Sequence, residues 1–164
     1  MPETRVLGRM LGTIHRYARM NFQEALGRIG FPEPALPYYM ALLEHDGIRQ
    51  DELTRLCHRD PATTTRAVTR MEHLGLVVRE VPEDDRRAKT VTLTPRGREL
   101  APAVRAVLDE WTRILAEGLT AEDVATALRL LERMATNAGN AVDGKLRNGD
   151  AAARTPACTA SWAR

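Results

Sequence analysis

The chain has 164 residues, a formal net charge of +2 at pH 7, two cysteines, and bases that are nearly all arginine, 22 against 2 lysines. This length suits one domain, or one domain with a tail, and is enough to bury a core. No stretch reaches the roughly 18 apolar residues of a membrane helix, the N-terminus lacks the apolar block of a signal peptide, and Cys57 and Cys158 form no motif. A cytoplasmic protein with reduced thiols is therefore expected.

Three helices are predicted in the first part of the chain. Apolar residues at helical spacing predict a long helix over about residues 3–28, which Gly30 and the prolines after it end. A strongly apolar helix is expected over about 35–45, and a third over about 50–58. Cys57 lies near the end of that third helix and is interpreted as a small core or partly buried residue.

A fourth helix is predicted over about residues 61–74. Asp60 and Pro61 form a cap followed by proline at the first helical position, and Gly75 is a C-terminal stop. The helix has two contrasting faces. Its apolar face comprises Ala67, Val68, Met71 and Leu74, and its outward face comprises Thr63, Thr64, Arg66, Thr69 and Arg70.

Two short strands follow, over about residues 76–81 and 90–93, each alternating with period two. Thr94 and Pro95 predict the start of a long helix that ends near Gly118. Thr120 and Asp123 resemble a capping box before a last helix that ends near residue 138. The composition then shifts to Ala, Gly, Asn, Asp and Thr, so residues 139–164 are expected to form a flexible tail.

Helix, turn, helix and hairpin, in this order, predict a winged helix-turn-helix within a mainly α fold. A recognition helix needs short polar and cationic side chains on the face that enters the major groove. Thr63, Thr64 and Thr65 suit phosphates or thymine methyls, and Arg66 and Arg70 suit guanine edges or phosphates. The alternative is an amphipathic helix whose outer face is merely solvated.

The hairpin tip carries three acids followed by three bases in PEDDRRAK. A wing that enters the minor groove needs an arginine, and an arginine on a loop must be aimed. We expect Asp85 to pair with Arg87 across the turn, which leaves Arg86 to project toward DNA. The alternative is an exposed charged turn without function, since such surface pairs contribute about 0–1 kcal/mol.

The segment from Asp60 to Gly97 resembles the winged-helix core of the MarR (multiple antibiotic resistance regulator) family of bacterial transcription factors. The pattern LGLV-x-R, a loop with DRR, a strand and LTPRG is far more specific than a generic helix-turn-helix. Helices before and after this core fit the family layout as well. The matching residues are Thr63, Thr65, Arg66, Arg70, Met71, Gly75, Leu76, Val77, Arg79, Asp85, Arg86, Arg87, Val91, Leu93, Thr94 and Gly97.

The resemblance implies a homodimer, with residues 1–32 and 98–138 as the helical dimerisation region and 33–97 as the DNA-binding region. Long apolar helices at both ends independently favour this division. Two lobes on a two-fold axis would bind a pseudo-palindromic operator in double-stranded DNA. The expected DNA-binding residues are Gln50, Thr63, Thr64, Thr65, Arg66, Arg70, Arg79, Asp85, Arg86, Arg87 and Lys89.

The resemblance also implies release of DNA when a small aromatic or phenolic acid binds between the two regions. His15, Arg19, Tyr38 and Trp111 are the candidate ligand-binding residues, because an arginine among apolar neighbours suits a carboxylate. The alternative is that Arg19 is solvated, Tyr38 is core and Trp111 packs in the dimer.

The predicted function is therefore a homodimeric, DNA-binding transcriptional regulator of the repressor type, released by a small ligand. Neither an enzyme nor a cofactor nor a metal site is predicted, because no phosphate loop, catalytic triad or metal-ligand spacing stands out. Two alternatives stay open. One is a winged-helix module that docks a protein partner, and the other is a regulator that senses oxidants through Cys57.

Overall fold

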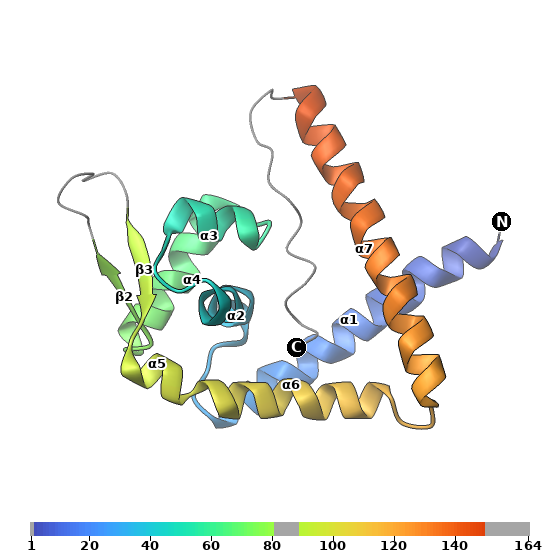
Figure 1. The fold of residues 1–164 in the computed structure, drawn as a ribbon, viewed down its shortest axis with the longest axis horizontal. Helices are drawn as coiled ribbons and strands as arrows, with labels where there is room; N and C mark the ends of the chain where they lie inside the picture. Colours follow the sequence, from blue (N-terminus) through green and yellow to red (C-terminus); the bar gives the residue numbers. More distant parts are fainter. Residues whose placement is uncertain (1, 81–88, 150–164) are drawn as a thin grey trace.

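The computed structural model describes residues 2–80 and 89–149, and the side chains of 5–80 and 89–142 within them. Figure 1 shows a winged lobe at one end and long helices extending from it. The elements in chain order are α1 (Pro2–Arg28), the 3-10 helix η1 (Glu33–Ala35), α2 (Leu36–Glu44), β1 (Ile48–Arg49), α3 (Gln50–Leu56), α4 (Pro61–His73), β2 (Val77–Glu80), β3 (Thr90–Leu93), α5 (Pro95–Glu99), α6 (Ala101–Leu115) and α7 (Ala121–Gly149).

The mainly helical winged fold predicted from the sequence is confirmed, and the first four helices lie where the apolar spacing places them. The sheet holds one strand that the sequence did not indicate. Its order is β1-β3-β2 with antiparallel pairs, and Ile48 on β1 pairs with Val91 on β3. β1 has only two residues, too few for a period-two pattern to be recognised.

The helix predicted over residues 95–118 is broken in two, and this prediction of a single helix is wrong. α5 ends at Glu99 and α6 begins at Ala101, with Leu100 as the cap of both. Pro102 explains the break, because it has no N–H to donate to the carbonyl of Arg98 and its ring would crowd that carbonyl in a continuous helix. The break lies where the winged lobe meets the long helices (Figure 1).

The last helix is longer than predicted. α7 continues from Ala121 to Gly149, so its predicted end near residue 138 is wrong and residues 139–149 of the expected tail are helical. The shift in composition after Asn137 predicted a tail, but one glycine inside a helix costs only about 1 kcal/mol. A helix that has been nucleated extends across such positions. Residues 150–164, including Cys158, lie outside the described part.

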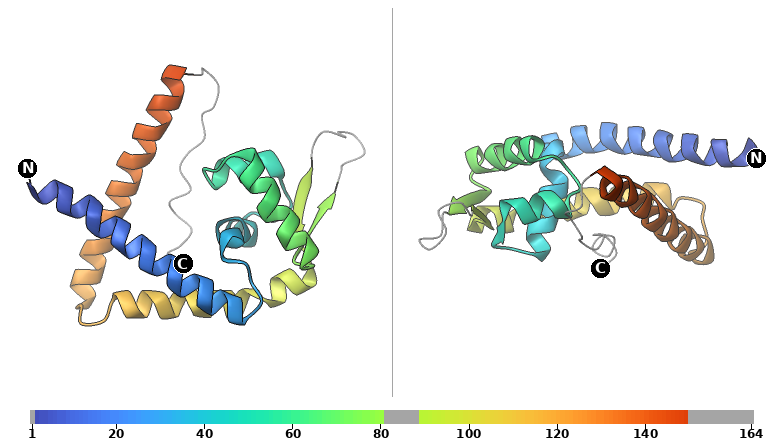
Figure 2. Two further views of the ribbon diagram at one scale, coloured as in Figure 1. Left: turned by 180° about the vertical axis from the view of Figure 1, so that it is seen from behind. Right: turned by 90° about the horizontal axis from the view of Figure 1, so that it is seen from above.

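The core lies inside the winged lobe and at its junction with α1 and α6. Tyr39, Leu53, Val68 and Val91 are fully or almost fully buried there. The long helices are different, because the N-terminal part of α1 and all of α7 lie outside the lobe (Figure 2). Large apolar side chains on them, such as Met20, are exposed.

The junction between β3 and α5 is locked onto the lobe by short contacts around Gly97. The backbone oxygen of Gly97 accepts a hydrogen bond of 2.5 Å from the buried Tyr39 hydroxyl. A Cβ at position 97 would lie 2.1 Å from the carbonyl oxygen of Leu76, so only glycine fits. Asp46 adds a second anchor, since its carboxylate accepts from the Leu93 backbone at 2.8 Å and from Arg98 at 2.6 Å.

Candidate nucleic-acid interface

Helix α4 is held by a cap at its start and by a buried face behind it. The Asp60 carboxylate accepts the backbone N–H of Thr63 at 2.8 Å, and hydrogen bonds from Thr63 lower the pKa of Asp60. Pro61 follows at the first helical position. The apolar side chains of Ala67, Val68 and Met71 are buried on the side facing the lobe, as predicted. The opposite side of α4 is thereby fixed outward.

Thr65, Arg66 and Arg70 are exposed on this outward side. Ala62 is exposed one turn earlier, and its short side chain was not singled out in the sequence. Thr64 is 0% exposed, so the prediction that it faces outward is wrong. It lies three and four residues before Ala67 and Val68, which places it on the buried stripe. Its hydroxyl donates to the Asp60 carbonyl at 3.1 Å.

The exposed polar groups of α4 are linked to one another and to α3. Arg66 donates to the Thr63 hydroxyl at 2.8 Å. The partly buried Gln50, the first residue of α3, donates from Nε2 to the Thr65 hydroxyl at 3.1 Å. The same hydroxyl donates to the Pro61 carbonyl at 2.8 Å. The outer face of α4 is therefore an ordered surface rather than a set of independent solvated side chains.

Two wing residues have defined surroundings. Arg79 on β2 forms an ion pair and hydrogen bonds with Glu72 of α4, and the side-chain hydrogen bond from Arg79 lowers the pKa of Glu72. Arg79 thus braces the wing against α4 in this arrangement. Lys89 is exposed, and its carbonyl accepts the Gln50 N–H at 2.8 Å. Asp85, Arg86 and Arg87 lie outside the described residues, so the brace between Asp85 and Arg87 stays a prediction.

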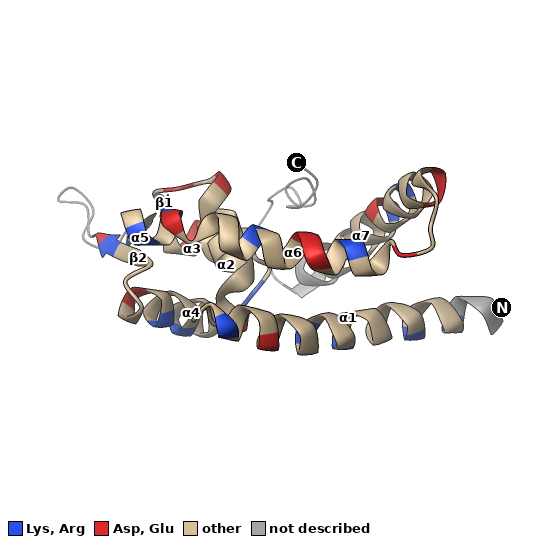
Figure 3. Cartoon of the chain, turned by 90° about the horizontal axis from the view of Figure 1, so that it is seen from below, with Lys and Arg blue, Asp and Glu red and all other residues tan. Residues whose placement is uncertain are grey.

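Basic side chains are distributed over more than the winged lobe. Figure 3 shows blue segments on α4 and at several turns of α1, with acidic segments between them. The net charge of +2 is consistent with this mixture. Attraction for an anionic partner therefore has to come from a local face, such as the outer face of α4.

The four candidate ligand-binding residues are not brought together by any contact in the described part of the chain. His15 and Arg19 are exposed on α1, and Arg19 pairs with Glu33 at 3.5 Å. Tyr38 is 1% exposed inside the lobe, where burial raises its pKa. Trp111 packs edge-on against Phe22, with ring centroids 5.9 Å apart. Tyr38 is a core residue, as the alternative interpretation had it.

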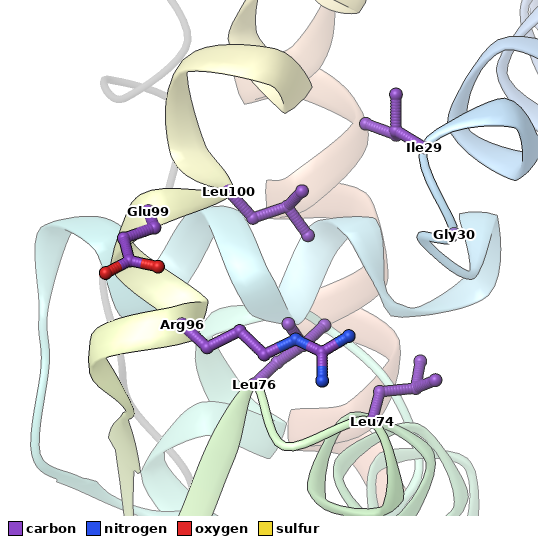
Figure 4. A pocket seen from close by; sticks show the side chains of 7 residues that line it. All are labelled: Ile29, Gly30, Leu74, Leu76, Arg96, Glu99 and Leu100. Atoms are coloured by element: carbon purple, nitrogen blue, oxygen red, sulfur yellow. The ribbon is translucent and has the colours of Figure 1, made fainter.

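A cavity of about 230 Å³ lies instead at the junction of α1, α4 and α5. Figure 4 shows the Arg96 guanidinium extended over Leu76 toward Leu74, while the Glu99 carboxylate lies on the other side. Arg96 was not among the predicted ligand-binding residues, because Ile29 and Leu74, which line the cavity with it, are distant in the sequence. The lining residues are Ile29, Gly30, Leu74, Leu76, Arg96, Glu99 and Leu100.

Across residues 2–80 and 89–149, no helix is both long and apolar enough to cross a membrane. No group of three or more His, Cys, Asp or Glu residues in that part of the chain could hold a metal ion. Cys57 is partly buried and packs against the core of the lobe.

A helix-turn-helix followed by a three-stranded wing defines a winged-helix protein, and the comparisons with known proteins give its class. The MarR family model matches residues 40–89. The structure of a MarR transcriptional regulator from Methanosarcina mazei Go1 is similar, with 28% identity and a TM-score of 0.78, over 82% of this chain and 96% of that one. These similarities indicate a transcriptional regulator rather than an enzyme.

Two curated proteins extend the comparison. The uncharacterized HTH-type transcriptional regulator YybA of Bacillus subtilis is 27% identical over 100 residues, which is 61% of this chain and 67% of YybA. An HTH-type transcriptional repressor of Mycobacterium tuberculosis is 29% identical over 132 residues, 80% of this chain and 94% of the repressor. The chain is thus similar to transcriptional regulators of the MarR family, whose family model matches its residues 40–89.

Proposed function

We propose that this regulator is a homodimeric repressor that binds a pseudo-palindromic operator with one α4 helix in each of two major grooves. The observation that carries the proposal is the outer face of α4, where Arg66 and Arg70 are exposed while the reverse face is buried. Arginine forks suit guanine edges and phosphates, and only a helix fixed by its back face can present them in register. The similarity to a curated repressor supports the repressor role.

Dimerisation is supported by the apolar side chains that the single chain leaves exposed. They lie on α1, at the end of α6, in the turn after it and on α7, and a soluble monomer rarely exposes so many large apolar groups together. A second copy of the chain would cover them. Residues 1–32 and 98–138, together with the continuation of α7 that carries Val142, then form the dimerisation region, and 33–97 the DNA-binding region. The exposed set is Val6, Leu7, Met10, Leu11, Ile14, Tyr17, Met20, Ile114, Leu115, Leu119, Leu128, Leu130, Leu131 and Val142.

A gel shift with the DNA upstream of the chain's own gene tests DNA binding. Binding at nanomolar protein is expected, and it should weaken by orders of magnitude between low and moderate salt, because each phosphate contact releases a counterion. Arg66→Ala should cost about 1–3 kcal/mol of binding free energy if a base contact is lost. Arg113→Ala on α6 is the matched control, since Arg113 pairs with Glu110 far from α4 along the chain.

The same assay separates the rival function, a winged-helix module that docks a protein. Binding that ignores salt, or no binding to any neighbouring promoter, would favour that module. A loss of melting temperature in Arg66→Ala without an effect on DNA would mean that the outer face of α4 serves folding instead.

The effector proposed for this repressor is a small aromatic acid. The cavity at the junction of α1, α4 and α5 supports it, because apolar walls suit a ring and the Arg96 guanidinium suits a carboxylate. Movement between α1 and α4 on binding would change the spacing of the two α4 helices. Salicylate, used as the probe, should raise the melting temperature of the parent protein in a thermal-shift titration. It should also release the DNA in the gel shift.

Two variants separate this cavity from the candidates on α1. Arg96→Gln should abolish the response to salicylate and leave operator affinity intact. Arg19→Gln should keep the response, because Arg19 pairs with Glu33 and does not line the cavity. The reverse result would move the effector site to α1. If peroxide releases DNA instead, and Cys57→Ser prevents it, the regulator senses oxidants rather than an acid.

A further inference from the structure

The hydroxyl of Thr65 is already engaged within the protein, although Thr65 is exposed on the DNA-facing side of α4. A threonine hydroxyl has one hydrogen to donate and two lone pairs to accept. Its hydrogen is directed to the Pro61 carbonyl at 2.8 Å, and one lone pair accepts from Gln50 Nε2 at 3.1 Å. No hydrogen is left for an acceptor on a base or a phosphate. What remains for contact with DNA is the γ-methyl and one lone pair, and that lone pair can meet only an N–H donor on an adenine or cytosine edge.

Gln50 holds this arrangement from α3. Its backbone N–H donates to the Lys89 carbonyl at the base of the wing, and its side-chain Oε1 is buried without a hydrogen-bond partner in the described residues. Because the Oε1 atom is buried, Gln50 cannot make the bidentate amide contact that reads adenine. One Nε2 hydrogen is used for the Thr65 hydroxyl. Gln50 therefore acts as a positioning residue for the Thr65 side chain.

Arg66, the next residue, is equipped for the opposite kind of contact. One guanidinium N–H is bonded to the Thr63 hydroxyl at 2.8 Å, which orients the group and leaves further N–H donors for guanine edges or phosphates. Neighbouring positions on α4 therefore differ in chemistry. Arg66 offers hydrogen bonds, whereas Thr65 offers an apolar surface. The only apolar group on a base edge in the major groove is the 5-methyl of thymine.

We infer that Thr65, positioned by Gln50, reads the 5-methyl group of a thymine in each half-site of the operator. The inference rests on the proposed function, in which α4 enters the major groove. It adds a base preference that an exposed threonine alone would not indicate, because a free hydroxyl would serve a phosphate or any acceptor equally well.

The test replaces single thymines by deoxyuridine in the promoter fragment that the protein protects in a footprint. Deoxyuridine removes the 5-methyl and keeps every hydrogen-bonding group. At one thymine in each half-site the affinity of the parent protein should fall about fourfold, the effect of one buried methyl. Thr65→Ser, which keeps the hydroxyl and loses the methyl, should lose this preference. Thr65→Val, which keeps a methyl and loses the hydroxyl, should retain it.

Further variants test the role of Gln50. Gln50→Ala removes one of the two hydrogen bonds that hold the Thr65 hydroxyl, which allows the side chain to rotate, and should bring the thymine-to-deoxyuridine affinity ratio close to one. The double variant Gln50→Ala/Thr65→Val should recover the ratio, because valine has no hydroxyl to turn outward. Arg66→Ala should lower affinity for both fragments equally. A purely structural role for Gln50 would lower affinity without changing the ratio, and would overturn its assignment.

Failure of this inference is distinct from failure of the proposed function. If the parent protein binds the thymine fragment tightly but tolerates deoxyuridine at every position, the methyl contact is refuted and the repressor proposal stands. If Thr65→Ser keeps the preference, another residue reads the methyl. If the thymine fragment itself is not bound, the proposed function fails first.

Discussion

The winged lobe buries its apolar side chains, whereas the long terminal helices leave many of theirs exposed. Leu53, Val68 and Val91 in the lobe are 0% exposed, whereas Tyr17 and Met20 on α1 are 60% and 64% exposed. Both regions are amphipathic in sequence, but only the lobe closes a core within one chain. The long helices carry exposed apolar side chains, and the ribbons of α7 and of the N-terminal part of α1 lie outside the lobe (Figure 2).

This difference indicates a division of labour. A lobe with its own core can keep α4 rigid, and rigidity is what presentation of side chains to a groove requires. In the proposed dimer, the long helices would be covered by a second copy and would set the distance between two such lobes. The two functions meet at α5, where Gly97 packs against the Leu76 carbonyl and Asp46 holds Arg98. A substitution in the long helices should therefore affect dimerisation first, and one in the lobe should affect stability or DNA binding first.

The largest expected effect comes from a charge on the apolar side of α1. Ile14→Lys should prevent dimerisation, because burial of an unpaired ammonium in an apolar interface is strongly unfavourable. Operator affinity should then fall more than about 100-fold, since two linked lobes gain about that factor or more over one. Sedimentation gives the oligomeric state and a gel shift gives the affinity.

Gln23→Lys is the matched control on the same helix, because Gln23 is exposed and polar and the added charge is identical. It should leave both the dimer and DNA binding unchanged. A monomeric Ile14→Lys protein that still binds the operator at full affinity would contradict the division between the two regions.

The second effect should be confined to the lobe. Leu53→Ala removes a fully buried side chain and should lower the free energy of unfolding by about 2–5 kcal/mol, through lost transfer energy and the cavity left behind. The protein should remain dimeric below its melting temperature. Leu131→Ala, at an exposed leucine of α7, should instead raise the dimer dissociation constant. Denaturant titration and sedimentation on both variants distinguish these outcomes.

Local signals in the sequence located most of the lobe. Asp60 with Pro61 starts α4, and Thr120 with Asp123 starts α7 through reciprocal hydrogen bonds of 2.9 and 3.2 Å. Such caps involve residues within one turn, so the sequence contains all of their geometry. The break at Leu100 could have been predicted as well, because Pro102 cannot belong to a continuous helix.

The residues that connect distant segments were not predictable in this way. Asp46 bonds to both Leu93 and Arg98, and Arg96 and Ile29 line the same cavity. The spacing of apolar residues along the chain does not show which distant residues come into contact. Thr64 is a different case, because its spacing from Ala67 and Val68 contains the answer. Its polar side chain favoured the outward assignment, although a threonine hydroxyl can bond its own helix backbone, as it does here.

A smaller, stabilising effect is expected in the turn between α3 and α4. His58 has a φ of 48°, the left-handed region, where a residue other than glycine is strained. His58→Gly should therefore raise the free energy of unfolding by about 0.5–1 kcal/mol, the relieved strain less the entropy of glycine. His73→Gly at the end of α4 is the control and should destabilise the lobe, because its backbone is helical. Equal effects of the two changes in chemical denaturation would show that the turn at His58 carries no strain.

The smallest expected effect is the pH dependence of the contact between α4 and the wing. Arg79 holds the pKa of Glu72 below its ordinary value of 4.5, so the folded protein binds this proton less readily than the unfolded chain. The stability that results is fully present above the ordinary pKa and is lost as pH falls through the lower, folded value. Because both side chains are partly exposed, at 38% for Glu72 and 21% for Arg79, this contribution to stability should be about 1 kcal/mol or less.

Glu72→Gln should lower the melting temperature at neutral pH, and the difference from the parent should shrink below about pH 4.5. Arg79→Gln should behave in the same way and add little in the double variant. A difference that stays constant down to about pH 3 would show that Glu72 acts through packing rather than through its charge.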